Sequence, residues 1–153
     1  MQPQRLTPTD NPAPVLALIR AAFAGMEGRV DPPSSARDLT EDSVRAQAAQ
    51  GEVWRIGKDP VLACVFLTVR PGALYLGKLA TAEAARGQGL ARRLVDHAAT
   101  RARALDLPLL ELQVRVELVE NHAAFAAMGF VQTGATAHPG YDRPTSFTFQ
   151  RKV

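Results

Sequence analysis

The stretch AARGQGLARRLV, residues 84–95, places two glycines in a short basic turn and then begins an apolar, helical pattern. The N-terminus of a helix carries roughly half a positive charge, so Arg86, Arg92 and Arg93 are unfavourable there by roughly a few tenths of a kcal/mol each. Gly87 and Gly89 remove side chains and let a partner approach the backbone closely. A phosphate bound by the loop amides and the arginines explains both features. The alternative is that the glycines only shape a strand-to-helix turn and the arginines face solvent.

Two common phosphate-binding patterns are excluded by the residues that follow the glycines. A Walker A loop requires Lys and then Ser or Thr after its last glycine, whereas Leu90 and Ala91 follow Gly89. A Rossmann fingerprint requires three glycines close to the first strand of the sheet. Here the turn lies in the middle of the chain, and Arg92 stands at the third glycine position.

Helical and strand patterns surround this turn and define the fold class. Apolar spacing predicts helices over residues 12–24, 40–50, 90–105 and 120–128, and strands over residues 4–7, 52–56, 61–69, 74–80, 110–116, 130–136 and 145–151. Tight connections at residues 58–60 and 70–72 indicate an antiparallel meander. The strand-helix-strand unit from 74 to 116 implies one parallel pair with a right-handed crossover. We therefore expect an α/β (α+β) fold with a mixed, mostly antiparallel central sheet covered by helices on both faces.

The bulk properties fit one domain over residues 1–153 and narrow the possible partners. A hydrophobic content of 46% is enough for a packed core. The net charge is +3, but the chain has no Lys/Arg run and few aromatics, so we expect no nucleic-acid partner. No apolar run approaches the roughly 20 residues of a membrane helix, and the N-terminus does not resemble a secretory signal, so we expect a cytoplasmic protein with no membrane partner. The single cysteine, Cys64, excludes a disulfide framework and a cysteine-based metal site, and we expect no metal.

Two landmarks of the sequence are Arg86-x-x-Gly89-x-Ala91 and the later segment NHAAFAAMGF. They resemble the Gcn5-related N-acetyltransferase (GNAT) superfamily: the first fits its Gln/Arg-x-x-Gly-x-Gly/Ala signature, and the second resembles its short helix that ends in Gly-Phe. The order of elements matches over nearly the whole chain. The resemblance implies acetyl-CoA as co-substrate, with the strand before the loop splayed from its parallel neighbour so that its backbone pairs with the pantetheine arm. The implied cofactor-binding residues are Leu79, Ala80, Thr81, Arg86, Gly87, Gln88, Gly89, Leu90, Ala91, Arg92, Asn121 and Phe125.

The catalytic residues are less well marked than the loop. Many family members have a proton-donating tyrosine four residues before the Gly of Gly-Phe, and this chain has Phe125 there. Tyr75 and Tyr141 are the only tyrosines, so one of them has to supply any phenol, unless each only packs its ring. His122 could act as an acid or base, or lie on the surface. Asn121 could touch the pantetheine or simply cap the short helix.

Two sets of polar residues are candidates for binding the acceptor. The strand at 110–116 has a polar face with Glu111, Gln113 and Arg115, which either lines a wet cleft or is solvated. The Gly-, Pro- and Ser-rich loop between the first two helices contributes Arg29, Asp31, Ser34 and Ser35 by position only. The loop HPGYDRP, with His138, could border the same pocket or be an ordinary turn.

The resemblance implies an N-acetyltransferase that moves an acetyl group from acetyl-CoA directly to a primary amine of a small molecule or peptide. The alternative is a non-catalytic module that senses acyl-CoA, which the phenylalanine at position 125 favours. Strands near the C-terminus could pair across a homodimer.

Overall fold

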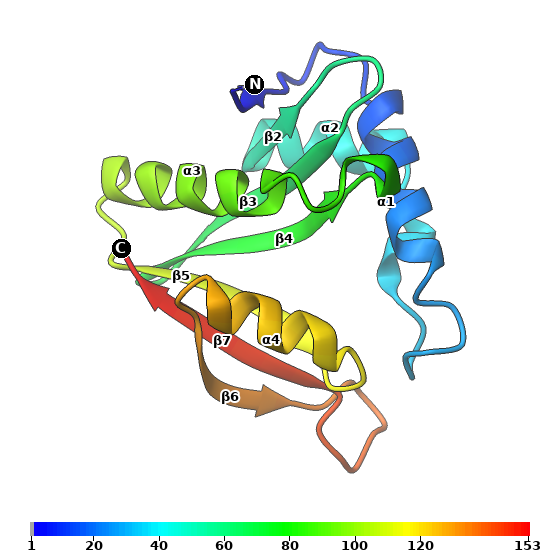
Figure 1. The fold of residues 1–153 in the computed structure, drawn as a ribbon, viewed down its shortest axis with the longest axis vertical. Helices are drawn as coiled ribbons and strands as arrows, with labels where there is room; N and C mark the ends of the chain where they lie inside the picture. Colours follow the sequence, from blue (N-terminus) through cyan, green and yellow to red (C-terminus); the bar gives the residue numbers. More distant parts are fainter. Residues whose placement is uncertain (1) are drawn as a thin grey trace.

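The computed structural model describes residues 2–153, which form one seven-stranded sheet with helices on both faces (Figure 1). The strand order is β1-β2-β3-β4-β5-β7-β6. The strands are β1 (Gln4–Arg5), β2 (Glu52–Ile56), β3 (Ala63–Arg70), β4 (Ala73–Thr81), β5 (Leu109–Arg115), β6 (Val131–Thr136) and β7 (Ser146–Lys152). The helices are α1 (Ala13–Ala24), α2 (Glu41–Gln50), α3 (Leu90–Ala104) and α4 (Val119–Ala127), with 3₁₀ turns η1 (Ser35–Asp38) and η2 (Glu83–Ala85). The predicted mixed, mostly antiparallel sheet is confirmed.

Each face of the sheet carries its own hydrophobic core. On one face, α3 buries Leu94, Val95 and Ala98 against β-strand residues such as Leu74 and Leu110. On the other, α1 and α2 bury Val15, Ile19 and Val44 against residues of β2 and β3. Figure 1 shows α3 and α4 in front of the sheet, with α1 and α2 behind it and at its side. Two opposed helix layers explain why β3 and β4 have apolar side chains on both faces.

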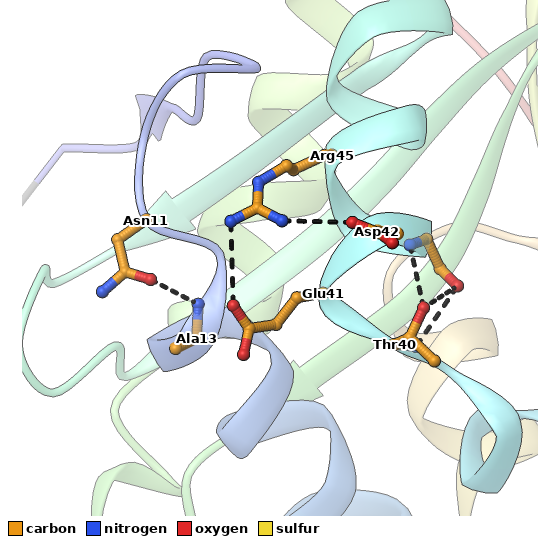
Figure 2. A network of polar contacts seen from close by, with 7 residues as sticks. Asn11, Ala13, Thr40, Glu41, Asp42 and Arg45 are labelled. Atoms are coloured by element: carbon orange, nitrogen blue, oxygen red, sulfur yellow. Dashed lines mark hydrogen bonds and ion pairs between the residues drawn. The ribbon is translucent and has the colours of Figure 1, made fainter.

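The second helix starts and ends at the residues its sequence predicts. Thr40 Oγ1 accepts from the Ser43 N–H at 3.2 Å, and Ser43 Oγ accepts from the Thr40 N–H at 3.2 Å, which together form a capping box (Figure 2). Arg45 lies between Asp42 at 3.2 Å and Glu41 at 3.8 Å on the exposed face. Asn11, in the same view, accepts from the Ala13 N–H at the start of α1.

The fourth helix begins earlier than the sequence predicts. Its first residue is Val119, and Leu118 is the N-cap without a side-chain hydrogen bond. The alternative that Asn121 caps this helix is therefore wrong, because Asn121 lies within the first turn. That leaves its amide side chain free of a capping role.

The parallel pair β4–β5 stays together only at one end. Ala73, Leu74 and Tyr75 pair with Leu109, Leu110 and Glu111, and no further residue of β4 pairs with β5. Beyond Tyr75, β4 pairs only with β3, and beyond Glu111, β5 pairs only with β7. Figure 1 shows the two strands diverging towards the side where α1 and the loop after it lie. The described strands thus have two unpaired backbone edges that face one another.

A β-bulge in β4 lies on this diverging segment. Between the pairs Phe66–Gly77 and Cys64–Ala80, β4 takes three steps where β3 takes two. Lys78 sits at the extra position with φ 52°, in the left-handed region that non-glycine residues rarely adopt. The Cys64 thiol points at the Lys78 carbonyl oxygen at 3.6 Å, and burial raises the pKa of that thiol to about 12. Cys64 is buried, as expected from its apolar surroundings.

A buried ion pair joins the longest helix to the sheet. Arg101 of α3 donates two hydrogen bonds to Glu52 of β2, at 2.8 and 2.7 Å, and Trp54 Nε1 donates a third at 2.7 Å. Burial opposes the charge, but the bonds from Arg101 and Trp54 hold the pKa of Glu52 below its ordinary value. Nothing in the spacing of these residues in the sequence predicted this pair.

We expect the Glu52→Gln substitution to lower the free energy of unfolding by about 2 kcal/mol, because it removes the charge from hydrogen bonds that are nearly buried. Urea unfolding at pH 7 measures this. A depressed pKa stabilises the fold above the carboxylate's unfolded pKa and ceases to do so as pH falls through the folded pKa. The difference between the variant and the native chain should therefore shrink towards pH 3.

The matched control is Glu41→Gln, which removes the same charge from the exposed pair with Arg45 (Figure 2). A loss below about 0.5 kcal/mol is expected there. Equal losses from the two substitutions would show that burial of Glu52 adds nothing.

Candidate active site

The glycine loop forms a hollow at the start of α3. Gly87 and Gly89 both have positive φ, 78° and 75°, and a Cβ at either position would meet no atom within 4 Å. The first backbone hydrogen bond of α3 runs from the Arg93 N–H to the Gly89 carbonyl at 3.0 Å, so the amides just before Arg93 have no acceptor within the helix. The hollow has a volume of about 370 Å³ and is lined by Thr81, Ala85, Arg86, Gly87, Gly89, Leu90, Ala91, Arg92 and Met128.

Two of the arginines predicted to meet the phosphates, Arg86 and Arg92, have different surroundings. Arg86 is exposed at the hollow, where its guanidinium can approach an anion. Arg92 donates to the Ala127 carbonyl at 3.3 Å, so it links the start of α3 to the end of α4. Arg92 lines the hollow while holding α4 beside it. Gln88 is exposed in the same loop.

A cavity of about 450 Å³ opens between the diverging strands. Its walls include Tyr75, Gly77 and Lys78 of β4 and Gln113 and Arg115 of β5. Further lining residues come from both hydrophobic cores, from α1 and from the loop after it: Phe23, Met26, Pro33, Ser34, Ser35, Phe66, Leu76, Leu79, Leu112, Val114 and Leu118. The cavity therefore passes between β4 and β5 and reaches both faces of the sheet.

The loop hollow and the cavity are neighbours along two elements. Leu79 lines the cavity and Thr81, two residues on, lines the hollow; Phe125 lines the cavity and Met128, one helical turn on, lines the hollow. Ala80, between the first pair, is buried on the α1 side and offers only its backbone. An extended ligand can run from the glycine loop along β4 and α4 into the cavity.

Tyr75 is the predicted catalytic tyrosine that the structure places in the cavity wall. The Arg70 guanidinium stacks on its ring, 3.6 Å from the ring centroid, and also forms an ion pair with Glu111 at 3.7 Å. Burial, and to a smaller extent Glu111, raises the pKa of the Tyr75 phenol. The phenol is therefore protonated at neutral pH and able to donate a proton.

His138 lines the same cavity from the loop between β6 and β7. Its Nδ1 and its backbone N–H both contact Thr145 Oγ1, and this hydroxyl also lies 3.4 Å from the Thr136 carbonyl oxygen. The Thr145 hydroxyl has a single proton, and donating it to the Thr136 carbonyl leaves its oxygen as an acceptor for His138. In that arrangement His138 Nδ1 carries the hydrogen and Nε2 keeps its lone pair. The sequence singled out this loop only as a possible border of the pocket, and His138 was not among the residues predicted to be catalytic.

Tyr141 and Asp31, both predicted site residues, meet outside the cavity lining. The Tyr141 hydroxyl donates to Asp31 Oδ1 at 2.6 Å, and Arg143 donates to Asp31 Oδ2 at 3.2 Å. This bond raises the pKa of Tyr141 and lowers that of Asp31. The contact joins two loops that are 110 residues apart in the chain and that lie side by side in Figure 1.

Two more predicted residues hold the same loop in place. Arg115 donates to the carbonyl oxygens of Pro32 and Pro33, at 2.6 and 3.1 Å, while also lining the cavity. Arg29 forms an ion pair with Glu120 of α4 at 2.5 Å. The loop from residue 25 to 38 is thus fastened to β5, α4 and the β6–β7 loop, with Ser34 and Ser35 facing the cavity.

His122 and Glu111 lie outside the cavity lining. His122 Nε2 donates to the Arg115 carbonyl at 2.9 Å, and its ring packs edge-on to Phe147. Glu111 accepts from Gln150 Nε2 at 2.8 Å. The catalytic role of His122 and the acceptor-binding role of Glu111 stay predictions, whereas Gln113, on the same polar face of β5 as Glu111, lines the cavity.

Phe125 and Asn121 both face the cavity from α4. Phe125 packs edge-on against Phe130 with ring centroids 5.7 Å apart. The wall at this point is apolar, so sulfur protonation requires a donor from another element. Tyr75 of β4 is the tyrosine that lines the cavity.

The arrangement is that of an acyltransferase, and a family comparison agrees. The model of the acetyltransferase (GNAT) family matches residues 17–130. The chain belongs to the GNAT acetyltransferase family.

Solved structures share this fold at low sequence identity. The PaiA N-acetyltransferase from Thermoplasma acidophilum in complex with coenzyme A is 11% identical with a TM-score of 0.83, covering 99% of this chain and 98% of that one. A GNAT family acetyltransferase from Elizabethkingia anophelis with acetyl-CoA bound is 14% identical with a TM-score of 0.69, covering 99% and 97%. The IAA acetyltransferase from Bacillus cereus is 17% identical with a TM-score of 0.68, covering 99% and 98%. A search of curated proteins found no match.

No helix among residues 2–153 combines the length and apolar character that crossing a bilayer requires. In the same residues, no group of three or more His, Cys, Asp or Glu side chains is placed to hold a metal ion.

Proposed function

We propose that the chain is an N-acetyltransferase that transfers the acetyl group of acetyl-CoA directly to a primary amine. The observation that supports this most is that the glycine-loop hollow lies next to a cavity open between the unpaired edges of β4 and β5. The diphosphate of CoA fits the hollow, where helix amides and Arg86 supply donors. The pantetheine arm fits the unpaired β4 edge from Leu76 to Thr81, because an extended amide chain can pair with a free strand edge.

The transfer needs no covalent enzyme intermediate. The amine nitrogen attacks the thioester carbonyl, the nitrogen–carbon bond forms, and the carbon–sulfur bond breaks with the electron pair going to sulfur. His138 Nε2 accepts the amine proton, directly or through a water, since an imidazole is suited to this near neutral pH. The Tyr75 phenol donates a proton to the departing thiolate. Holding amine and thioester together in the cavity supplies much of the rest of the rate.

A thiol-release assay with acetyl-CoA and a panel of small and peptide amines tests this proposal. Turnover that disappears in the Gly89→Glu variant supports it. Tight CoA binding by calorimetry with no turnover on any amine would favour the second candidate, an acyl-CoA sensor, which the apolar Phe125 in the cavity wall favours.

The Phe125→Tyr variant distinguishes the two possible proton donors. If Tyr75 is the donor, a second phenol adds little, and we expect kcat within about threefold of the native value. We also expect the free energy of unfolding to change by less than about 1 kcal/mol, since the added hydroxyl would lie at the cavity. Steady-state kinetics and urea unfolding measure both.

A gain in kcat of tenfold or more would instead show that position 125 is the productive donor site and that Tyr75 is not.

The proposed homodimer through strands near the C-terminus rests on β6, which forms one edge of the sheet and whose residues are all exposed. Sedimentation equilibrium measures it.

A further inference from the structure

The ionisable side chains of the cavity wall are all potential cations, apart from Tyr75. Lys78, Arg115 and His138 line it, and none of its described lining residues is an aspartate or a glutamate. Two cationic side chains in a half-closed space create a positive potential there, because low-dielectric walls focus the field. The cavity is therefore suited to an anionic group.

The carboxylates near the cavity lie outside its lining, and Asp31 and Glu120 have cationic partners of their own. Asp31 is held by Tyr141 and Arg143, and Glu120 by Arg29. Glu117 accepts from the Asp31 backbone N–H at 3.2 Å. Arg115, by contrast, donates its hydrogen bonds to the carbonyl oxygens of Pro32 and Pro33, which are neutral acceptors. No carboxylate of the described residues forms an ion pair with it, although its charge contributes to lowering the pKa of the nearby Asp31.

The β-bulge directs Lys78 into this space. In a regular strand, Lys78 would share a face with Leu74 and Leu76, which pack on the α3 side. Instead its ammonium donates to Ser35 Oγ at 3.2 Å and lies 5.9 Å from the ring centroid of Phe23, both on the α1 side. A strained backbone conformation that re-aims a charged side chain into a cavity is typical of a functional position.

Lys78 is an incompletely satisfied cation. Its ammonium has three donors, and its side-chain hydrogen bond goes to one neutral hydroxyl, that of Ser35. Burial, followed by the charge of Arg115, lowers the pKa of Lys78, so these surroundings disfavour its charged form. A bound anion would reverse that effect.

We propose, resting on the N-acetyltransferase function above, that the acceptor is a small primary amine that also carries a carboxylate. Lys78 and the Ser35 hydroxyl bind the two carboxylate oxygens, and Arg115 adds attraction from the opposite wall. The same positive field disfavours the ammonium form of the acceptor and so favours the neutral amine that attacks the thioester. Acceptors with a second ammonium in place of the carboxylate are repelled.

The test uses the ω-amino acids β-alanine, γ-aminobutyrate and 5-aminopentanoate, their primary amides, and the diamines putrescine and spermidine. In the native chain we expect kcat/KM for the best free acid to exceed that for its amide by about 100-fold. Lys78→Met should remove this preference: kcat/KM for the acid should fall, whereas kcat/KM for the amide should stay within about threefold of that of the native chain. Lys78→Arg should retain most of it, because the positive charge remains.

Lys58→Met should leave the preference unchanged, because Lys58 lies in the exposed loop between β2 and β3 and does not line the cavity. Calorimetry with CoA checks that each variant binds the co-substrate as the native chain does. Equal or faster turnover of amides or diamines, with acetyl transfer intact, would overturn the carboxylate proposal alone. A preference unchanged in Lys78→Met would also overturn it.

If no amine is turned over, the enzymatic proposal fails while the anion site is still testable. Backbone NMR shifts with pentanoate, which has the carboxylate and no amine, report the site directly. Saturable shifts around Ser35 and Gly77 in the native chain that vanish in Lys78→Met support the anion site. No shifts at 20 mM pentanoate would overturn it.

Discussion

Gly89→Glu is expected to weaken CoA binding by more than about 100-fold while leaving the chain folded. The new carboxylate would lie in the hollow at the start of α3, close to the position proposed for the diphosphate. At about 4 Å and an effective dielectric constant of about 20, two like charges repel by about 4 kcal/mol, which exceeds the roughly 2.7 kcal/mol of a 100-fold loss. Isothermal titration calorimetry with CoA measures the affinity.

Gly72→Glu is the matched control for this substitution. Gly72 has φ 73°, against 75° at Gly89, and a Cβ there also meets no atom within 4 Å. The two variants should therefore share a backbone strain of about 1–2 kcal/mol and the same added charge. Only Gly89→Glu should lose affinity for CoA. Equal affinity in the two variants would show that the diphosphate does not bind at the glycine loop.

Tyr75→Phe is expected to lower kcat by about 100-fold, the lower end of the range for a general acid. The Michaelis constant for acetyl-CoA should stay within about threefold, since the ring and its contact with Arg70 remain. Because the acid form is required and burial raises its pKa, native activity should persist into alkaline solution and fall only as the phenol ionises. The variant should lack that alkaline decline.

Tyr141→Phe removes the same hydroxyl from the other tyrosine of the chain. Its hydroxyl binds Asp31 and lies outside the cavity lining, so we expect a loss in kcat below about fivefold. If the large loss falls on Tyr141→Phe and not on Tyr75→Phe, the assignment of the proton donor is reversed.

The features that depend on local sequence could be predicted well. The loop from Arg86 to Ala91, the helix after it and the capping of α2 by Thr40 follow from residues near one another in the chain. The parallel pair β4–β5 followed from the length and handedness of one crossover. Each of these rests on a pattern that the chain shows within about 40 residues.

The features that depend on register or distant contacts could not be predicted. A single extra residue in β4 turns Lys78 from the α3 core to the cavity, and nothing in the apolar pattern marks a bulge there. The bonds from Arg115 and Tyr141 to the loop at 31–33 join segments more than 80 residues apart. From the sequence, Arg115 was a candidate acceptor ligand and Tyr141 a candidate catalytic residue, because a polar side chain that fastens a loop cannot be told from one that binds a ligand by its residue type.

The most direct test of the central claim is a crystal structure of the chain with CoA bound. The account predicts the diphosphate on the amides of residues 87–91 and the sulfur between β4 and β5, within hydrogen-bonding reach of the Tyr75 hydroxyl and beside Phe125. A sulfur outside that cavity, or a diphosphate away from the glycine loop, would contradict it.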